Sequence, residues 1–146
     1  MRRALLAIIL LAYGKLDMPK KILFVDDEAK WREMVSEFLT CAGYEVRTAE
    51  NGTDAMLAAD QVRPDLMVLD LNLSGESGFN LMAFLVENHP GIPIIVHSGL
   101  SNDDEAIQFM LANGAYRYVQ KSSLEALLKA VQEAPSALAS RTAEPA

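Results

Sequence analysis

Acidic, hydroxyl and amine side chains follow the short apolar runs of this sequence, each where a run ends. Asp26 and Asp27 come directly after the run at 22–25, and Asp70 comes after the run at 66–69. Ser98 follows the run at 92–97, and Lys121 comes shortly after the run at 116–119. Carboxylates, a hydroxyl and an ammonium are groups that bind a divalent cation and a phosphoryl group. These five side chains can do such chemistry only if the fold brings them together.

Short aliphatic runs alternate with longer amphipathic segments between residues 20 and 134. This alternation is typical of βαβ units on a parallel sheet with helices on both faces. We expect Gly43 and Gly114 to end two of the helices, and Ser122 to cap the last helix with Glu125 in capping-box spacing. The sequence predicts strands at 22–25, 45–48, 66–69, 92–97 and 116–119, and helices at 29–42, 53–61, 78–88, 103–113 and 123–134.

The expected strand order explains how the reactive groups would meet. In a doubly wound sheet of order 2-1-3-4-5 the first and third strands are neighbours, so Asp26, Asp27 and Asp70 would converge at one edge. Three close carboxylates repel one another unless a proton or a divalent cation neutralises them, and oxygen-only ligands favour Mg²⁺. Asp70 stands alone after the central strand, which makes it the expected nucleophile for an aspartyl phosphate. Lys121 and Ser98 would face the phosphoryl oxygens.

Composition excludes several other classes of protein. Thirteen Lys and Arg against twenty Asp and Glu give a net charge of −7, which argues against direct nucleic-acid binding through a general basic surface. The single cysteine, Cys41, can form neither an intramolecular disulfide nor a structural zinc site, which favours a reducing compartment. We therefore expect a cytoplasmic protein.

The two ends of the chain differ from the middle. Residues 1–19 form an apolar extension, either a weak signal-like segment or a misassigned start, and the cytoplasmic chemistry favours the second interpretation. Its uncharged run is about half the roughly 20 residues of a spanning helix, so we expect no stable membrane insertion. Residues 20–134 form the expected domain, and residues 135–146 are rich in Ala, Ser and Pro and are expected to be a flexible tail.

Four segments of the sequence, at 21–28, 69–78, 94–99 and 114–121, read KILFVDDE, LDLNLSGESG, IIVHSG and GAYRYVQK. In this order and spacing they resemble the receiver domain of response regulators in bacterial two-component signalling. The resemblance covers residues 20–134 and implies a flavodoxin-like α/β fold, a doubly wound five-stranded parallel sheet of order 2-1-3-4-5 with helices on both faces. It also implies that Asp70 is the phosphoacceptor.

The resemblance assigns roles to the remaining site residues. Asp27, Asp70 and the backbone carbonyl of Asn72 would bind Mg²⁺, and Asp26 would do so through water. Ser98 and Lys121 would hold the phosphoryl oxygens. A switch aromatic of the family corresponds to Tyr118, whose side-chain rotamer would follow the phosphorylation state.

The function implied is that of a stand-alone receiver without an output domain. A sensor histidine kinase or a phosphotransfer protein would phosphorylate Asp70 with Mg²⁺ as cofactor. Output would pass to a downstream protein by contact with the fourth helix, fifth strand and fifth helix. Such a protein is not an enzyme, apart from catalysing its own phosphorylation and dephosphorylation.

Ser74 and Ser122 depart from the family pattern, and Leu100 bears on the rate of dephosphorylation. Ser74 stands where the family often has proline, and Ser122 stands where a cis-proline usually follows the lysine. A cis bond before serine costs about 2.5–4 kcal/mol, so this peptide is either strained or trans, with a possible displacement of Lys121. Leu100 lies where family members tune water access, and an apolar residue there suggests slow self-dephosphorylation.

Other functions stay open at this point. Ser122 supports a degenerate receiver that binds a protein partner without phosphorylation. A phosphatase of the haloacid dehalogenase type also uses an Asp nucleophile, but it needs a second Asp where this chain has Asn72. A dinucleotide or flavin site is disfavoured because acidic residues occupy the loop that would need glycines.

Four aromatic residues, three of them on the last two predicted strands, also have a structural interpretation. His97 precedes Ser98 on its strand, so it points to the opposite face and is expected to be structural. Alternation sends Tyr116 and Tyr118 to the same face. Trp31 is expected to serve packing alone.

Overall fold

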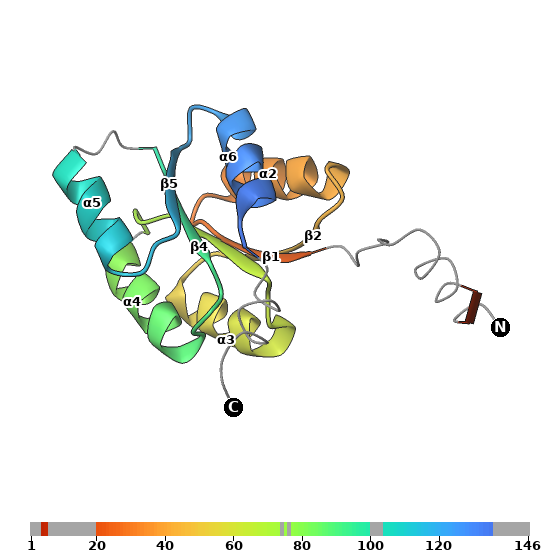
Figure 1. Cartoon of the computed structure of the whole chain (residues 1–146), viewed down its shortest axis with the longest axis horizontal. Coiled ribbons are helices and arrows are strands. Elements are labelled where there is room, and N and C mark those ends of the chain that lie inside the picture. Colours follow the sequence, from red (N-terminus) through yellow and green to blue (C-terminus); the bar gives the residue numbers. More distant parts are fainter. Residues whose placement is uncertain (1–3, 6–19, 74, 76, 100–103, 136–146) are drawn as a thin grey trace.

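The computed structural model describes residues 4–5, 20–73, 75, 77–99 and 104–135, and it contains one parallel five-stranded sheet. The strand order is β2-β1-β3-β4-β5, so the predicted doubly wound α/β fold is confirmed (Figure 1). The strands are β1 (Lys21–Val25), β2 (Glu45–Ala49), β3 (Leu66–Leu69), β4 (Ile94–Ser98) and β5 (Arg117–Gln120).

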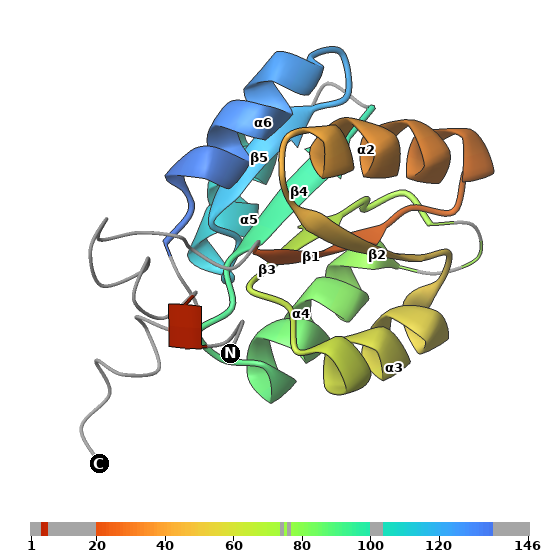
Figure 2. The same cartoon turned by 90° about the vertical axis from the view of Figure 1, so that its right-hand side faces the viewer.

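Helices cover both faces of the sheet and form the outer layers (Figure 2). The helices are α2 (Ala29–Cys41), α3 (Gly52–Val62), α4 (Gly78–Asn88), α5 (Asp104–Ala112) and α6 (Leu124–Glu133). The expected first to fifth helices therefore correspond to α2 to α6. Helices α2 and α6 pack on one face, and α3, α4 and α5 pack on the other.

The alternation of side chains along the strands builds these two layers. On β1, Ile22 and Phe24 face α2 and α6, whereas Leu23 and Val25 face the opposite layer. All four are fully buried, because both faces of the strand are covered. A strand of this kind reads as a continuous apolar run, which is why the sequence predicted it.

The last two strands begin later than predicted. Strand β4 begins at Ile94, because Pro93 has no N–H to donate to a neighbouring strand. Strand β5 begins at Arg117, so Tyr116 lies before the regular alternation. Tyr116 packs against the α2 and α6 side and Tyr118 against the α3 to α5 side. The expectation that the two tyrosines share a face was therefore wrong.

Glycines and serines mark several helix ends. Gly43 and Gly114 adopt φ values of +102° and +114° after α2 and α5, as predicted. The cap of α6 is Ser123, whose hydroxyl accepts a hydrogen bond from Ala126 N–H at 3.0 Å. The prediction that Ser122 is the cap was wrong by one residue, because α6 begins at Leu124.

Several sequence expectations lie outside the described residues. These are the extension at 1–3 and 6–19, the tail at 136–146, and the positions Ser74 and Leu100. Within the described ranges, none of the helices is both long and apolar enough to cross a bilayer.

Candidate functional site

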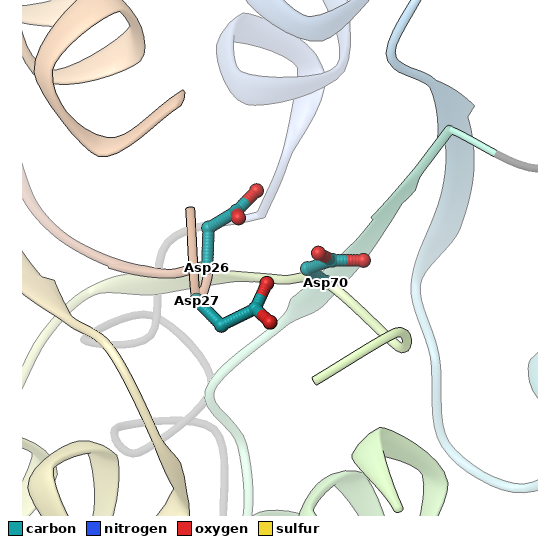
Figure 3. Close-up of side chains that lie close together, drawn as sticks. All are labelled: Asp26, Asp27 and Asp70. Atoms are coloured by element: carbon teal, nitrogen blue, oxygen red, sulfur yellow. The ribbon is translucent and has the colours of Figure 1, made fainter. Parts of the chain in front are cut away.

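Three carboxylates meet at the carboxyl end of the sheet. Asp26 and Asp27 follow β1, and Asp70 follows β3, which pairs directly with β1 through Val25 and Leu69. One carboxylate oxygen from each aspartate lies within 4.8 Å of the others, and Figure 3 shows the three side chains close together. The predicted convergence of the three acids is confirmed in the structure.

Backbone contacts hold two of these carboxylates in place. The amide of Glu28 donates to Asp26 Oδ1 at 2.9 Å, and the amide of Asn72 donates to Asp70 Oδ1 at 3.0 Å. Each bond leaves the Oδ2 atom of the same aspartate to face the interior of the site. The turns after β1 and β3 therefore orient the acids before any ligand arrives.

Burial makes the charged form of these carboxylates energetically unfavourable. Asp26 is fully buried and Asp70 is 2% exposed. Burial raises the pKa of Asp26, and the nearby Asp70 carboxylate raises it further, while Lys121 and the Glu28 amide pull it down. Negative charge held in so little water attracts a cation.

Lys121 supplies positive charge opposite the acids. Its Nζ lies 2.7 Å from Asp26 Oδ2 and 3.2 Å from Asp70 Oδ2, and its side chain is 8% exposed. Burial lowers the pKa of Lys121, but the two carboxylates outweigh burial and leave this pKa raised. The ammonium therefore stays charged at neutral pH.

The serine after Lys121 does not displace the lysine. The described part of the chain contains no cis peptide bond, so the peptide between Lys121 and Ser122 is trans. The Lys121 N–H donates to the Ser98 carbonyl at 2.8 Å, which fixes the backbone beside β4. Of the two expected possibilities, the structure shows a trans peptide with the ammonium still in the site.

The remaining predicted residues lie on β4, on β5 and in the turn after β3. Ser98 is the last residue of β4 and is 2% exposed, and Asn72 lines an opening onto the site. Tyr118 is half-buried on β5, where it pairs with Val96, and it faces the α3 to α5 layer. That opening is lined by Glu28, Trp31, Asp70, Asn72, Gly99, Lys121 and Ser122.

His97 lies on the other face of β4, as predicted. It is fully buried against the rings of Phe24 and Trp31, and its ring nitrogens have no hydrogen-bond partner among the residues that the structure describes. Burial, and secondarily the charge of Lys121, lowers the pKa of His97 to about 4. The imidazole is therefore neutral at pH 7.

Sequence reasoning missed two contacts of the site. Arg32 donates from Nη1 to the Asp26 carbonyl at 2.8 Å and lies 3.6 Å from the Glu50 carboxylate. Trp31 carries its ring next to the Lys121 ammonium. Both residues lie in the first turns of α2, directly after the acidic pair, and that position is the only signal in the sequence.

Comparison with known proteins identifies the family of this chain. The family model described as "Response regulator receiver domain" matches residues 22–132. The chain belongs to this family. Receiver domains bind Mg²⁺ at an acidic pocket, and this receiver domain contains the acidic cluster Asp26, Asp27 and Asp70. Receiver domains of response regulators interact with histidine kinases or phosphotransfer proteins.

Individual relatives agree with this assignment. The receiver domain is 42% identical over 118 residues to the phosphate regulon transcriptional regulatory protein PhoB of Pseudomonas aeruginosa, covering 77% of this chain and 51% of that protein. It is 34% identical over 107 residues to the probable transcriptional regulatory protein TcrX of Mycobacterium tuberculosis, covering 73% and 46%. The chain thus spans about half the length of these curated relatives.

Solved structures show the same architecture. The chemotaxis protein CheY4 of Vibrio cholerae is 33% identical with a TM-score of 0.73, covering 78% of this chain and 97% of that chain. NtrX from Brucella abortus is 31% identical with a TM-score of 0.74, covering 86% of this chain and 28% of that one. The flavodoxin-like arrangement inferred from the sequence is therefore shared with known receivers.

Proposed function

We propose that this receiver domain accepts a phosphoryl group on Asp70 from a phosphohistidine of a sensor histidine kinase or a phosphotransfer protein. The observation that carries the proposal is the Asp70 carboxylate, buried beside two further acids and 3.2 Å from the Lys121 ammonium. A carboxylate oxygen of Asp70 forms the new O–P bond while the P–N bond to the donor imidazole breaks. The electron pair of that bond leaves with the imidazole nitrogen.

The acidic residues fit a bound Mg²⁺. Asp26, Asp27 and Asp70 offer hard oxygen ligands, and the backbone carbonyl of Asn72 completes the proposed set. When bound, Mg²⁺ would offset the repulsion between the carboxylates and the incoming phosphoryl oxygens. Lys121 provides the complementary charge from the protein itself, and Ser98 lies at the end of β4 to hold a further oxygen.

The output of the modified site would be a change in protein contacts. Tyr118 lies half-buried on β5 facing the α5 side, so its rotamer can respond to changes at Ser98 on the neighbouring strand. We propose that phosphorylation biases the face formed by α5, β5 and α6 toward a downstream protein. In this scheme the domain catalyses only its own phosphorylation and dephosphorylation.

Mass spectrometry tests the phosphoacceptor role. The protein is incubated with acetyl phosphate, with and without Mg²⁺, beside the variants Asp70→Asn and Asp65→Asn as target and control. Wild type and Asp65→Asn should each gain the mass of one phosphoryl group when Mg²⁺ is present, and Asp70→Asn should gain none. An unmodified wild type would instead favour a degenerate receiver that binds its partner without phosphorylation. Steady hydrolysis of a generic phosphate ester would favour a phosphatase.

A further inference from the structure

The Lys121 ammonium has a third neighbour besides the two acids. Its Nζ lies 4.8 Å from the centre of the Trp31 ring, over the ring face. An aromatic face attracts a cation, and the attraction is stronger where water is excluded. With its side chain 8% exposed, Lys121 meets that condition. Trp31 also lines the opening that leads to Asp70, so the indole lies at the mouth of the site.

The indole is itself held in a fixed orientation. The Trp31 and His97 rings meet nearly perpendicular, at 83° with their centres 5.8 Å apart. His97 is in turn fully buried and lies 6.0 Å from the Phe24 ring. A buried imidazole packed in this way leaves the indole little freedom to rotate. The ring face that meets Lys121 is therefore set by the core beneath β4.

We propose that Trp31 is a positioning residue that holds the Lys121 ammonium in the site during phosphoryl transfer. Both carboxylates that contact Lys121 are also the groups that would engage a cation or the phosphoryl group, so these ion pairs change during the reaction. The indole face carries no formal charge and engages neither ligand. It gives Lys121 one contact that stays constant. This inference rests on the proposed function of Asp70.

Rates of phosphorylation by acetyl phosphate with Mg²⁺ give the first test. Trp31→Leu keeps apolar bulk but removes the ring face, and it should slow the reaction about tenfold. Trp31→Phe restores a ring face and should stay within about threefold of wild type. Phe38→Leu makes the same kind of change at another half-buried position of α2, and its rate should match wild type. A wild-type rate in Trp31→Leu, or equal losses in the leucine and phenylalanine variants, would overturn the proposal.

A second measurement is independent of phosphorylation. In protein labelled with ¹³C at lysine Cε, ring currents should shift the Lys121 ε-methylene resonance upfield of the other lysines. The resonance is assigned by its absence in Lys121→Met. The upfield shift should disappear in Trp31→Leu and persist in part in Trp31→Phe, and an unshifted wild-type resonance would contradict the contact. If wild type takes up no phosphoryl group, the proposed function fails, and this spectrum alone decides whether Trp31 holds Lys121.

Discussion

Helices α5 and α6 lie on opposite faces of the sheet next to β5, but they are packed very differently. Helix α6 buries Leu127, Ala130 and Val131, whereas Met110 is the only buried residue of α5. Two large apolar side chains of α5, Phe109 and Leu111, are 57% and 38% exposed. Helix α6 is therefore the more firmly anchored of the two.

Polar contacts add to the anchoring of α6. Ser123 caps its first turn, and the Tyr116 hydroxyl donates to the Glu133 carbonyl at 3.0 Å near its last turn. Arg117 forms an ion pair with the Glu133 carboxylate at 2.6 Å. The contacts of Glu133 tie the last turn of α6 to the segment around the start of β5, while the Ser123 cap holds the first turn of the helix together.

Lys121 and the predicted switch residue Tyr118 lie on different sides of this contrast in packing. Lys121 comes between β5 and α6, so its backbone belongs to the firmly packed side. Tyr118 faces the lightly packed side with α5. Elements with few buried contacts open and shift at lower free-energy cost than well-packed ones. Movement of α5 therefore costs less free energy than movement of α6.

The largest expected effect comes from the same substitution made on each helix. Leu127→Ala removes a fully buried side chain from α6 and should lower the free energy of unfolding by about 3–4 kcal/mol. Leu111→Ala removes a partly exposed side chain from α5 and should lower it by less than about 1 kcal/mol. Urea denaturation followed by circular dichroism measures both. Equal losses would contradict the difference in packing.

The second expected effect concerns His97, on the face of the sheet that α6 covers. Because its pKa falls from 6.5 to about 4 on folding, the unfolded chain binds one more proton between these pH values. The stability that the neutral imidazole contributes is complete above pH 6.5 and is lost as the pH falls. The loss in the free energy of unfolding reaches about 3 kcal/mol near pH 4.

Urea denaturation at several pH values tests this effect. His97→Leu should remove this part of the acid sensitivity, so the stability difference between variant and wild type should change with pH in that window. His89→Gln replaces the other histidine and should leave the acid sensitivity in place. A pH-independent difference for His97→Leu would show that His97 does not resist protonation in the folded protein.

The smallest expected effect distinguishes two adjacent serines at the start of α6. Ser123→Ala removes the side chain that accepts from Ala126 N–H and should cost about 1 kcal/mol. Ser122→Ala should leave the free energy of unfolding nearly unchanged, because α6 does not use this serine as its cap. Thermal denaturation of the two variants gives the comparison. A larger loss in Ser122→Ala would place the cap where the sequence pattern predicted it.

The sequence was sufficient for the architecture and for the acidic half of the site. Strands buried on both faces must be almost wholly apolar, so β1 and β3 stand out as runs such as 66–69. The residue after such a run must lie at the carboxyl edge of the sheet, which places Asp26 and Asp70 without any knowledge of packing. Alternation along β4 likewise separates Ser98 from His97.

Tertiary packing alone decided which serine caps α6, where the Lys121 ammonium lies and which ring it contacts. Two serines precede α6 with similar capping potential, and only the register of the helix against the sheet selects Ser123. The Lys121 ammonium stays in the site although a trans peptide follows this residue. Asp26 and Asp70 hold the ammonium, and a backbone hydrogen bond to β4 holds the Lys121 main chain. Trp31 meets Lys121 across a long stretch of chain, and no local period encodes such a contact. Periodicity reports which face a residue occupies, whereas its partner on that face depends on how the layers pack.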